Sequence, residues 1–242
     1  MTEEQFKAFD SFRNEFKAKI INWNNQVPDL QHLQQDAAKE ADTPNYPFEN
    51  PIVYNTALDD ITKDDEIKII VIGDNPGKNE QLTKNQKYLV GQAGKLGEGF
   101  FKKNPELGID FRKNAVILNK TPVHSAKTNQ LKTIRKNGGQ AVSRLLDESQ
   151  IWMAEKTCTL AKVLKAEIWL VGYSELKPRG IFSLYRDEMK KNADWEKLFV
   201  YQHFSMNCFS KDIKNFMSSH NDLSLKDALI QLGNIHKQEI FF

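Results

Sequence analysis

Four short apolar runs divide the chain and predict the strands of a sheet. They lie at Ile67–Ile72, Asn114–Leu118, Glu167–Val171 and Leu198–Tyr201. The first run, IKIIVI, is almost entirely β-branched, which is typical of a central parallel strand buried on both faces. Turn-forming or polar residues follow each run, as expected where a strand ends in a loop.

Apolar residues between these runs recur at helical spacing. An aromatic stripe with spacings of three and four predicts a helix over residues 3–23 that packs against the domain. Four prolines make residues 24–55 irregular, apart from one possible helix. The polar residues 147–150 could divide a long helix in two. The remaining helices are expected at about residues 30–41, 93–103, 140–165, 180–190, 210–218 and 224–236.

Strands that alternate with helices over 242 residues predict one α/β domain. We expect a three-layer α/β/α sandwich with a central four-stranded, mainly parallel sheet. Residues 1–60 would form an N-terminal helical extension, residues 67–212 the core, and residues 213–242 the C-terminal helices. Folds of this kind place their ligand sites outside the carboxyl ends of the strands.

Composition and charge are those of an ordinary globular protein, with 40% hydrophobic and 27% charged residues. The net charge of +2 excludes a polybasic binder, so any contact with nucleic acid must come from a local patch. Outside the N-terminal helix, basic side chains are densest after the second strand. This group contains Lys120, Lys127, Lys132, Arg135 and Lys136.

The two cysteines, Cys158 and Cys208, provide neither a disulfide framework nor a C-x-x-C metal pair. They also cannot ligate a four-cysteine iron–sulfur cluster. No apolar run has membrane length, and no signal peptide follows Met1. We therefore expect a cytoplasmic protein with no membrane partner. We also expect it to be a monomer.

Polar side chains follow three of the predicted strands. The first strand ends in GDNPG at residues 73–77, the second at Asn119, and the fourth shortly before His203. Because the carboxyl ends of parallel strands meet at one edge of a sheet, Asp74, Asn75, Asn119 and His203 should converge there. Each residue alone is better explained as a turn former, a cap or a structural side chain. Their joint recurrence at strand ends favours a site.

Several segments, in this order and placement, resemble motifs of the uracil-DNA glycosylase superfamily. The GDNPGKNE and YLVGQAGKL segments resemble the first motif and its downstream Val-Gly-x-Ala-Gly signature. VILN resembles the strand that ends in the uracil-reading asparagine, and HFS resembles the His-Pro-Ser motif. IWLVG adds weaker support. These segments are residues 73–80, 88–96, 116–119, 203–205 and 168–172, within a resemblance that covers about residues 67–212.

The resemblance implies hydrolysis of the N-glycosidic bond of uracil, or of a related damaged base, in DNA during base excision repair, with no metal and no organic cofactor. The base would leave the duplex to reach the pocket. His203 would donate a hydrogen bond to O2 of the departing base. Asn119 would read N3–H and O4 of uracil. Asp74 or Asn75 would hold the water, and only Asp74 could also act as a base.

The same resemblance implies further contacts with the base and with DNA. Gly73 and Leu89 would border the base, and Tyr88 is the nearest aromatic ring on which it could stack. Met206 or Phe209, in the loop after the histidine motif, could enter the minor groove as an apolar wedge. The candidate phosphate contacts are Ser205, Lys211, Lys120, His124 and Lys127.

The chain also differs from the family pattern. Asp74 stands where the iron–sulfur branch of the family usually has glutamate, and Asn75 stands where the mismatch-specific branch has asparagine. Leu89 stands in line with the stacking phenylalanine of the iron–sulfur branch, and Phe204 replaces the proline of the last motif. Two alternatives therefore stay open. One is a catalytically inactive member of the fold that binds a nucleobase or nucleic acid. The other is a hydrolase of nucleosides or other small molecules.

Overall fold

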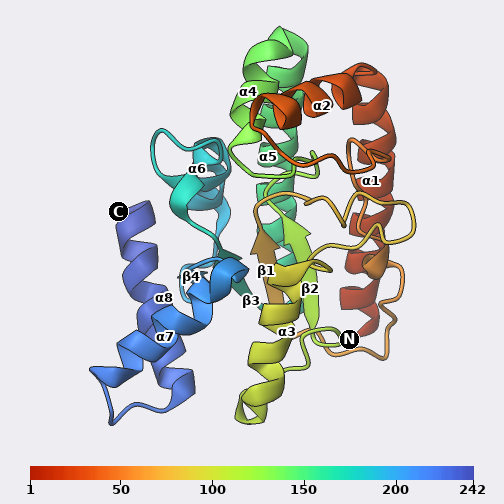
Figure 1. Cartoon of the computed structure of the whole chain (residues 1–242). Coiled ribbons are helices and arrows are strands. Elements are labelled where there is room, and N and C mark those ends of the chain that lie inside the picture. Colours follow the sequence, from red (N-terminus) through yellow and green to blue (C-terminus); the bar gives the residue numbers. More distant parts are fainter.

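The structure is a computed structural model that describes all 242 residues, and it has the predicted α/β/α layers around one four-stranded sheet (Figure 1). The strands are β1 (Ile69–Gly73), β2 (Ala115–Asn119), β3 (Glu167–Val171) and β4 (Leu198–Tyr201). They run parallel in the order β2-β1-β3-β4. In this register Ile72 lies opposite Leu118 and Leu170. All four predicted strands are confirmed to within two residues.

The helices cover both faces of the sheet. The seven helices expected from the sequence are present, and an eighth was not expected. They are α1 (Glu3–Gln26), α2 (Leu30–Glu40), α3 (Gln92–Lys103), α4 (Gln130–Asn137), α5 (Gly139–Leu164), α6 (Ser183–Asn192), α7 (Cys208–Ser218) and α8 (Leu225–Phe241). None of them is both long enough and apolar enough to cross a membrane.

The unexpected helix, α4, lies within the segment after β2 in which basic side chains are densest. Its eight residues contain only two apolar side chains, Leu131 and Ile134, and both are fully buried. Two apolar residues are too few to form a recognisable amphipathic pattern in the sequence. The helix is stabilised mainly by the packing of these two side chains against the rest of the protein.

The expected break in the long helix is wrong, because α5 continues through residues 147–150. Ser149 and Gln150 are the two buried side chains of this segment, and each has a hydrogen-bond partner inside the protein, although Gln150 Nε2 has none. The Ser149 hydroxyl lies 2.8 Å from the Thr121 hydroxyl, and Gln150 Oε1 accepts a hydrogen bond from the Tyr185 backbone N–H at 3.3 Å. Internal hydrogen bonds therefore allow a polar segment to remain helical and buried.

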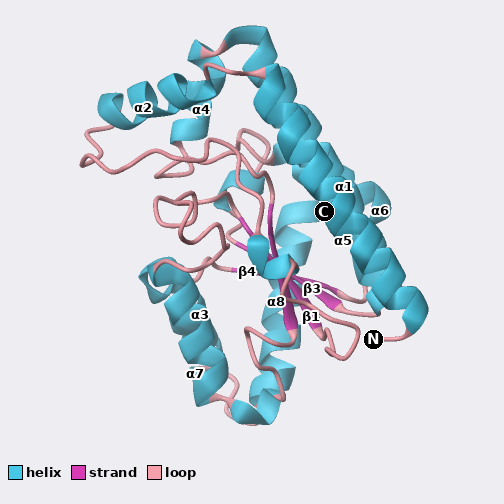
Figure 2. Ribbon diagram, turned by 90° about the vertical axis from the view of Figure 1, so that its right-hand side faces the viewer, coloured by secondary structure: helices cyan, strands magenta, loops and turns pink.

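Alternate residues of β1 face two separate apolar clusters, and all five residues of the strand are buried. Ile70 and Ile72 belong to the cluster beneath α1 and α5, whereas Ile69 and Val71 face the cluster beneath α3, α7 and α8. Figure 2 shows the strands between these two sets of helices. Polar groups of β1 can therefore reach a ligand only at the ends of the strand.

The N-terminal helix α1 packs its aromatic stripe against α5, as expected. Its fully buried Phe16 stacks on Trp152 of α5 with ring centroids 5.4 Å apart, and on Phe12 at 5.9 Å. Thr2 and Gln5 form a capping box at the start of the helix. The extension is therefore continuous with the hydrophobic core.

Replacing Phe16 by alanine should lower the free energy of unfolding by about 3–5 kcal/mol, because it removes a buried aromatic ring and leaves a cavity. Chemical denaturation followed by circular dichroism measures this change. Ile21 is the matched control on the same helix, since its side chain is 64% exposed, and Ile21→Ala should change stability by less than about 0.5 kcal/mol. Equal effects of the two substitutions would show that α1 does not unfold with the core.

Candidate functional site

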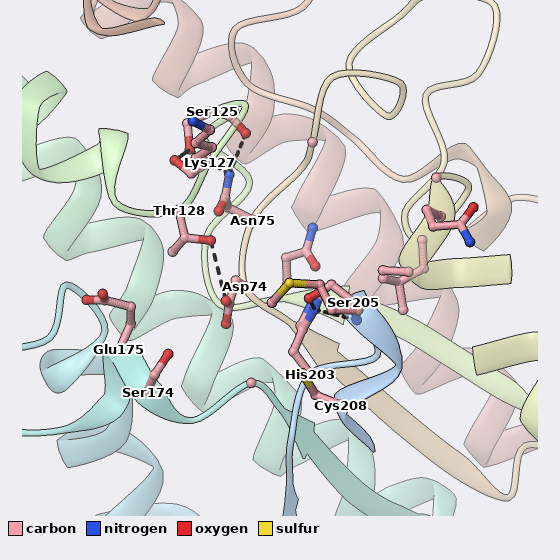
Figure 3. A pocket seen from close by; sticks show the side chains of 18 of the residues that line it. Asp74, Asn75, Ser125, Lys127, Thr128, Ser174, Glu175, His203, Ser205 and Cys208 are labelled. Carbon is pink, nitrogen blue, oxygen red and sulfur yellow. Dashed lines mark hydrogen bonds between the residues drawn. The ribbon is translucent and has the colours of Figure 1, made fainter. Parts of the chain in front are cut away.

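A cavity of about 510 Å³ opens at the carboxyl edge of the sheet, where segments that follow all four strands meet (Figure 3). The chain leaves β1 toward β2 on one side and returns to β3 on the other, so this edge contains the topological switch point of the sheet. Asp74, Asn75, Asn119 and His203 all border the cavity. The side chains that we expected to converge therefore lie around one space.

Asp74, directly after β1, is paired with a buried lysine. Nζ of Lys120, which follows β2, lies 2.6 Å from Asp74 Oδ1 and donates to the carbonyls of Val171 (3.0 Å) and Gly73 (3.3 Å). Thr128 Oγ1 makes a longer contact of 3.4 Å with Asp74 Oδ2. Burial lowers the pKa of Lys120, and the Asp74 carboxylate opposes this effect. Lys120 is fully buried, so its expected role in phosphate binding is wrong.

Asn75 is oriented by the loop that precedes α4. Its Nδ2 donates to Ser125 Oγ at 2.9 Å and to the backbone carbonyls of Ser125 and Pro76, both at 3.2 Å. These contacts use the amide nitrogen. The amide oxygen of Asn75 makes no hydrogen bond within the protein, so it can accept one from a water or a ligand.

Asn119, the last residue of β2, is only 2% exposed, and its Nδ2 has no hydrogen-bond partner. A buried amide without a partner is costly, so this group in the wall of the cavity is available to an acceptor on a ligand or a water. Gly73 makes room for this amide, because a Cβ at position 73 would lie 2.5 Å from Asn119 Oδ1. Gly73 thus shapes the site without bordering the cavity itself.

His203 follows β4 and presents a hydrogen-bond donor to the cavity. Its Nδ1 accepts from the Ser205 backbone N–H at 3.1 Å and lies 2.8 Å from Ser205 Oγ. Because a backbone N–H can only donate, Nδ1 carries no proton and the neutral ring is protonated on Nε2. Burial lowers the pKa of His203; Asp74 opposes this and Lys120 adds to it. Nε2 has no partner within the protein, so its proton is free for a ligand.

Gly172, directly after β3, separates Asp74 from His203. Its φ of +82° lies in the left-handed region that favours glycine. A Cβ at this position would lie 3.0 Å from both Asp74 Oδ1 and His203 Cδ2. The absence of a side chain therefore allows the carboxylate and the imidazole to share one space. We had interpreted this glycine only as the end of a strand.

Two aromatic residues proposed to contact DNA or the base do not reach the cavity. Tyr88 is 1% exposed and its hydroxyl donates to the Val53 carbonyl at 2.6 Å, so its proposed stacking role is wrong. Phe209 is also 1% exposed and packs against Phe100 with ring centroids 4.8 Å apart, so it is no wedge. Leu89, by contrast, borders the cavity with an unusual φ of +51°.

The substitution of phenylalanine for the motif proline leaves the cavity open. Phe204 is 2% exposed and packs beneath α3, in edge contact with Phe111 at a centroid distance of 5.9 Å. Met206, two residues later, is 78% exposed at the rim of the cavity and has a left-handed backbone with φ +52°. Of the two proposed wedge residues, only Met206 is therefore accessible to a partner.

The remaining candidate phosphate contacts differ in accessibility. His124 is fully buried: its ring bridges the Pro76 carbonyl (2.8 Å) and the Tyr46 hydroxyl (3.0 Å), and burial lowers its pKa to about 4. Its expected role in binding phosphate is therefore wrong. Lys127 and Lys211 are exposed, and Lys127 borders the cavity.

Much of the expected basic group is neutralised by acidic neighbours. Lys132 forms an ion pair with Glu175 at 2.9 Å, and Arg135 forms one with Asp147. A basic side chain that is already paired with a carboxylate contributes little net positive charge to attract the phosphates of a nucleic acid. The group is therefore less available to nucleic acid than its density in the sequence indicates.

Glu80 is a cavity residue to which the sequence analysis gave no role. It is 8% exposed, and its Oε2 accepts from the Gly77 backbone N–H at 3.1 Å. Burial raises its pKa to about 7, opposed mainly by hydrogen bonds from the backbone of Gly77 and Leu89. It therefore ties the turn after β1 to the segment that contains Leu89. Nothing in the sequence around Glu80 indicates that this carboxyl group is buried.

Comparison with known proteins gives no match: no protein-family model, no curated protein and no solved structure matches the chain. The structure also contains no group of three or more histidine, cysteine or acidic side chains that could hold a metal ion. The functional interpretation therefore depends on the geometry of the cavity and on the motifs in the sequence.

The raised pKa of Glu80 predicts how stability depends on pH. Between its usual value of 4.5 and about 7, the folded protein retains a proton that the unfolded chain releases. Stability should therefore fall by about 3 kcal/mol as the pH rises through this window. Glu80→Gln should lack this loss, so the variant should gain about 3 kcal/mol relative to the wild type between pH 4.5 and pH 8.

Urea denaturation at pH 4.5, 6 and 8 measures this difference. The exposed Glu106 provides the control, because Glu106→Gln should show a nearly constant difference from the wild type over the same range. Parallel curves for Glu80→Gln and the wild type would contradict the assignment of this titration to Glu80.

Proposed function

We propose that the protein is a DNA glycosylase that hydrolyses the N-glycosidic bond of uracil, or of a related damaged base, in DNA. The observation that carries this proposal is the buried Asn119 amide, whose Nδ2 has no partner and which borders the same cavity as Asp74, Asn75 and His203. The ordered resemblance of the surrounding motifs to the uracil-DNA glycosylase superfamily adds independent support.

The unpaired amide suits the edge of uracil. Asn119 Nδ2 would donate to O4, and its Oδ1 would accept from N3–H. Cytosine carries an amino group in place of O4 and an acceptor at N3, so both contacts would be lost. Since a mismatched base leaves buried polar groups unpaired, such a site can discriminate strongly.

The other groups suit the charges that develop as the bond breaks. The bond between C1′ and the base nitrogen breaks with its electrons on the base, which leaves as an anion, and the oxygen of water bonds to C1′. The Nε2–H of His203 would stabilise the anion at O2. The carboxylate of Asp74 would stabilise the cationic sugar and take the proton of the water, which the Asn75 oxygen could help to orient.

Access to the cavity requires the base to leave the duplex. Met206 is exposed at the rim and would occupy the space that the base leaves in the stack. Lys127 and Lys211, both exposed, would bind phosphates on either side of the flipped nucleotide. Few such contacts predict weak, salt-dependent binding to undamaged DNA.

The wild-type protein should release uracil from single- or double-stranded oligonucleotides, detected as strand cleavage after alkali treatment. Asn119→Ala should lower the single-turnover rate by about 10²–10⁴-fold, because the contacts that distinguish uracil are lost. The matched control is Asn221, an exposed asparagine between α7 and α8. Asn221→Ala should retain the wild-type rate.

The same experiment separates the alternative functions. Binding of uracil-containing DNA without product would favour an inactive base-binding protein and contradict the glycosylase proposal. Turnover of free nucleosides, with association to DNA that is weak and insensitive to salt, would favour a nucleoside hydrolase.

A further inference from the structure

A buried ammonium group lies behind Asp74, at the carboxyl ends of β1 and β3. Lys120 is fully buried, and each N–H of its Nζ has an acceptor: Asp74 Oδ1 at 2.6 Å, the Val171 carbonyl at 3.0 Å and the Gly73 carbonyl at 3.3 Å. Two of these acceptors belong to the ends of neighbouring strands. The position of the charge is therefore set by the sheet itself.

Stability alone does not explain a charge at this position. An ammonium loses its hydration when it is buried, and apolar replacements of buried ion pairs are often neutral or stabilising. The lysine nitrogen also lies 5.5 Å from the ring centre of Phe182, and a cation–π contact of this kind compensates only in part for the lost hydration. The one partner of Lys120 that borders the cavity is Asp74.

The ion pair makes the two oxygens of Asp74 inequivalent. Oδ1 is held by the lysine, whereas Oδ2 has only the 3.4 Å contact with the Thr128 hydroxyl. Figure 3 shows Asp74 between Thr128 and His203. A carboxylate held by one oxygen keeps a single orientation and presents the other oxygen to the cavity.

We propose that Lys120 is a positioning residue for catalysis: its ammonium fixes the orientation of the Asp74 carboxylate, with Oδ2 directed to the place where the sugar cation would form. This inference rests on the proposed glycosylase function. It assigns a catalytic purpose to a lysine whose charge reaches neither solvent nor substrate. It also predicts that the influence of Lys120 on the reaction passes entirely through Asp74.

A double-mutant cycle tests this prediction with four proteins: the wild type, Lys120→Met, Asp74→Asn and the double variant. Single-turnover release of uracil is measured from pH 5 to 9, and thermal unfolding reports on the fold. Lys120→Met should lower the rate by about 10²–10³-fold. Its affinity for the uracil oligonucleotide should stay within about threefold of the wild type.

The split between rate and affinity provides a readout that a merely structural role would not give. A disordered site would bind the uracil oligonucleotide more weakly as well as react more slowly, whereas a misoriented Asp74 carboxylate lowers the single-turnover rate alone. In the Asp74→Asn background, where no carboxylate remains, the lysine substitution should change the rate by less than about threefold.

The outcomes are distinct. A wild-type rate for Lys120→Met, or equal losses in both backgrounds, would overturn the positioning role while leaving the glycosylase proposal intact. An inactive wild type would instead overturn the proposed function. Lys120→Met could fail to fold, since it leaves Asp74 unpaired. The comparison of Asp74→Asn with the double variant then decides, because the double variant carries neither charge.

Discussion

The complete burial of the central sheet is the constraint on which the rest of this structure depends. Every residue of β1 is buried, and alternate side chains enter apolar clusters on opposite faces. No polar side chain can project from such a strand without losing its hydration. The polar groups of the molecule that could perform chemistry are therefore confined to the strand ends, and the carboxyl edge collects them in one cavity.

Within that cavity, the hydrogen bonds that the protein makes to itself determine what it can offer to a ligand. The amide nitrogen of Asn75 donates a hydrogen bond to Ser125, and Nδ1 of His203 accepts one from Ser205. One oxygen of Asp74 accepts a hydrogen bond from Lys120. The groups left over are the oxygen of Asn75, the Nε2–H of His203, the second oxygen of Asp74 and the amide of Asn119. These free donors and acceptors are the groups from which we propose a glycosylase function.

The same edge shows how buried charge and missing side chains cooperate in one site. Lys120 directly follows β2, and its ammonium donates to the last carbonyl groups of β1 and β3, so one side chain links the ends of three strands. Gly73 and Gly172 leave the space that the Asn119 amide, the carboxylate and the imidazole occupy. The contribution of each glycine becomes apparent only when a Cβ is placed at its position, because that atom would lie too close to these groups.

Most of the fold could be predicted from the chain, because strands and helices follow local patterns. The apolar runs located all four strands, and amphipathic spacing located seven helices. Helix α4 was missed because its two apolar residues form no periodic pattern, and the break expected in α5 was wrong because Ser149 and Gln150 have buried partners. Local composition does not reveal partners that are distant in the sequence.

By itself, the sequence determined which polar residues follow the strands, and hence that Asp74, Asn75, Asn119 and His203 border a common edge. Only the tertiary structure determined which of the other candidate residues are exposed to a ligand and which are buried. It buried Lys120, His124, Tyr88 and Phe209, which a linear reading places among the contacts to DNA or the base. The physical reason is that the positions of strands along the chain follow from local hydrophobicity, whereas exposure and hydrogen bonding depend on packing between segments far apart in the chain.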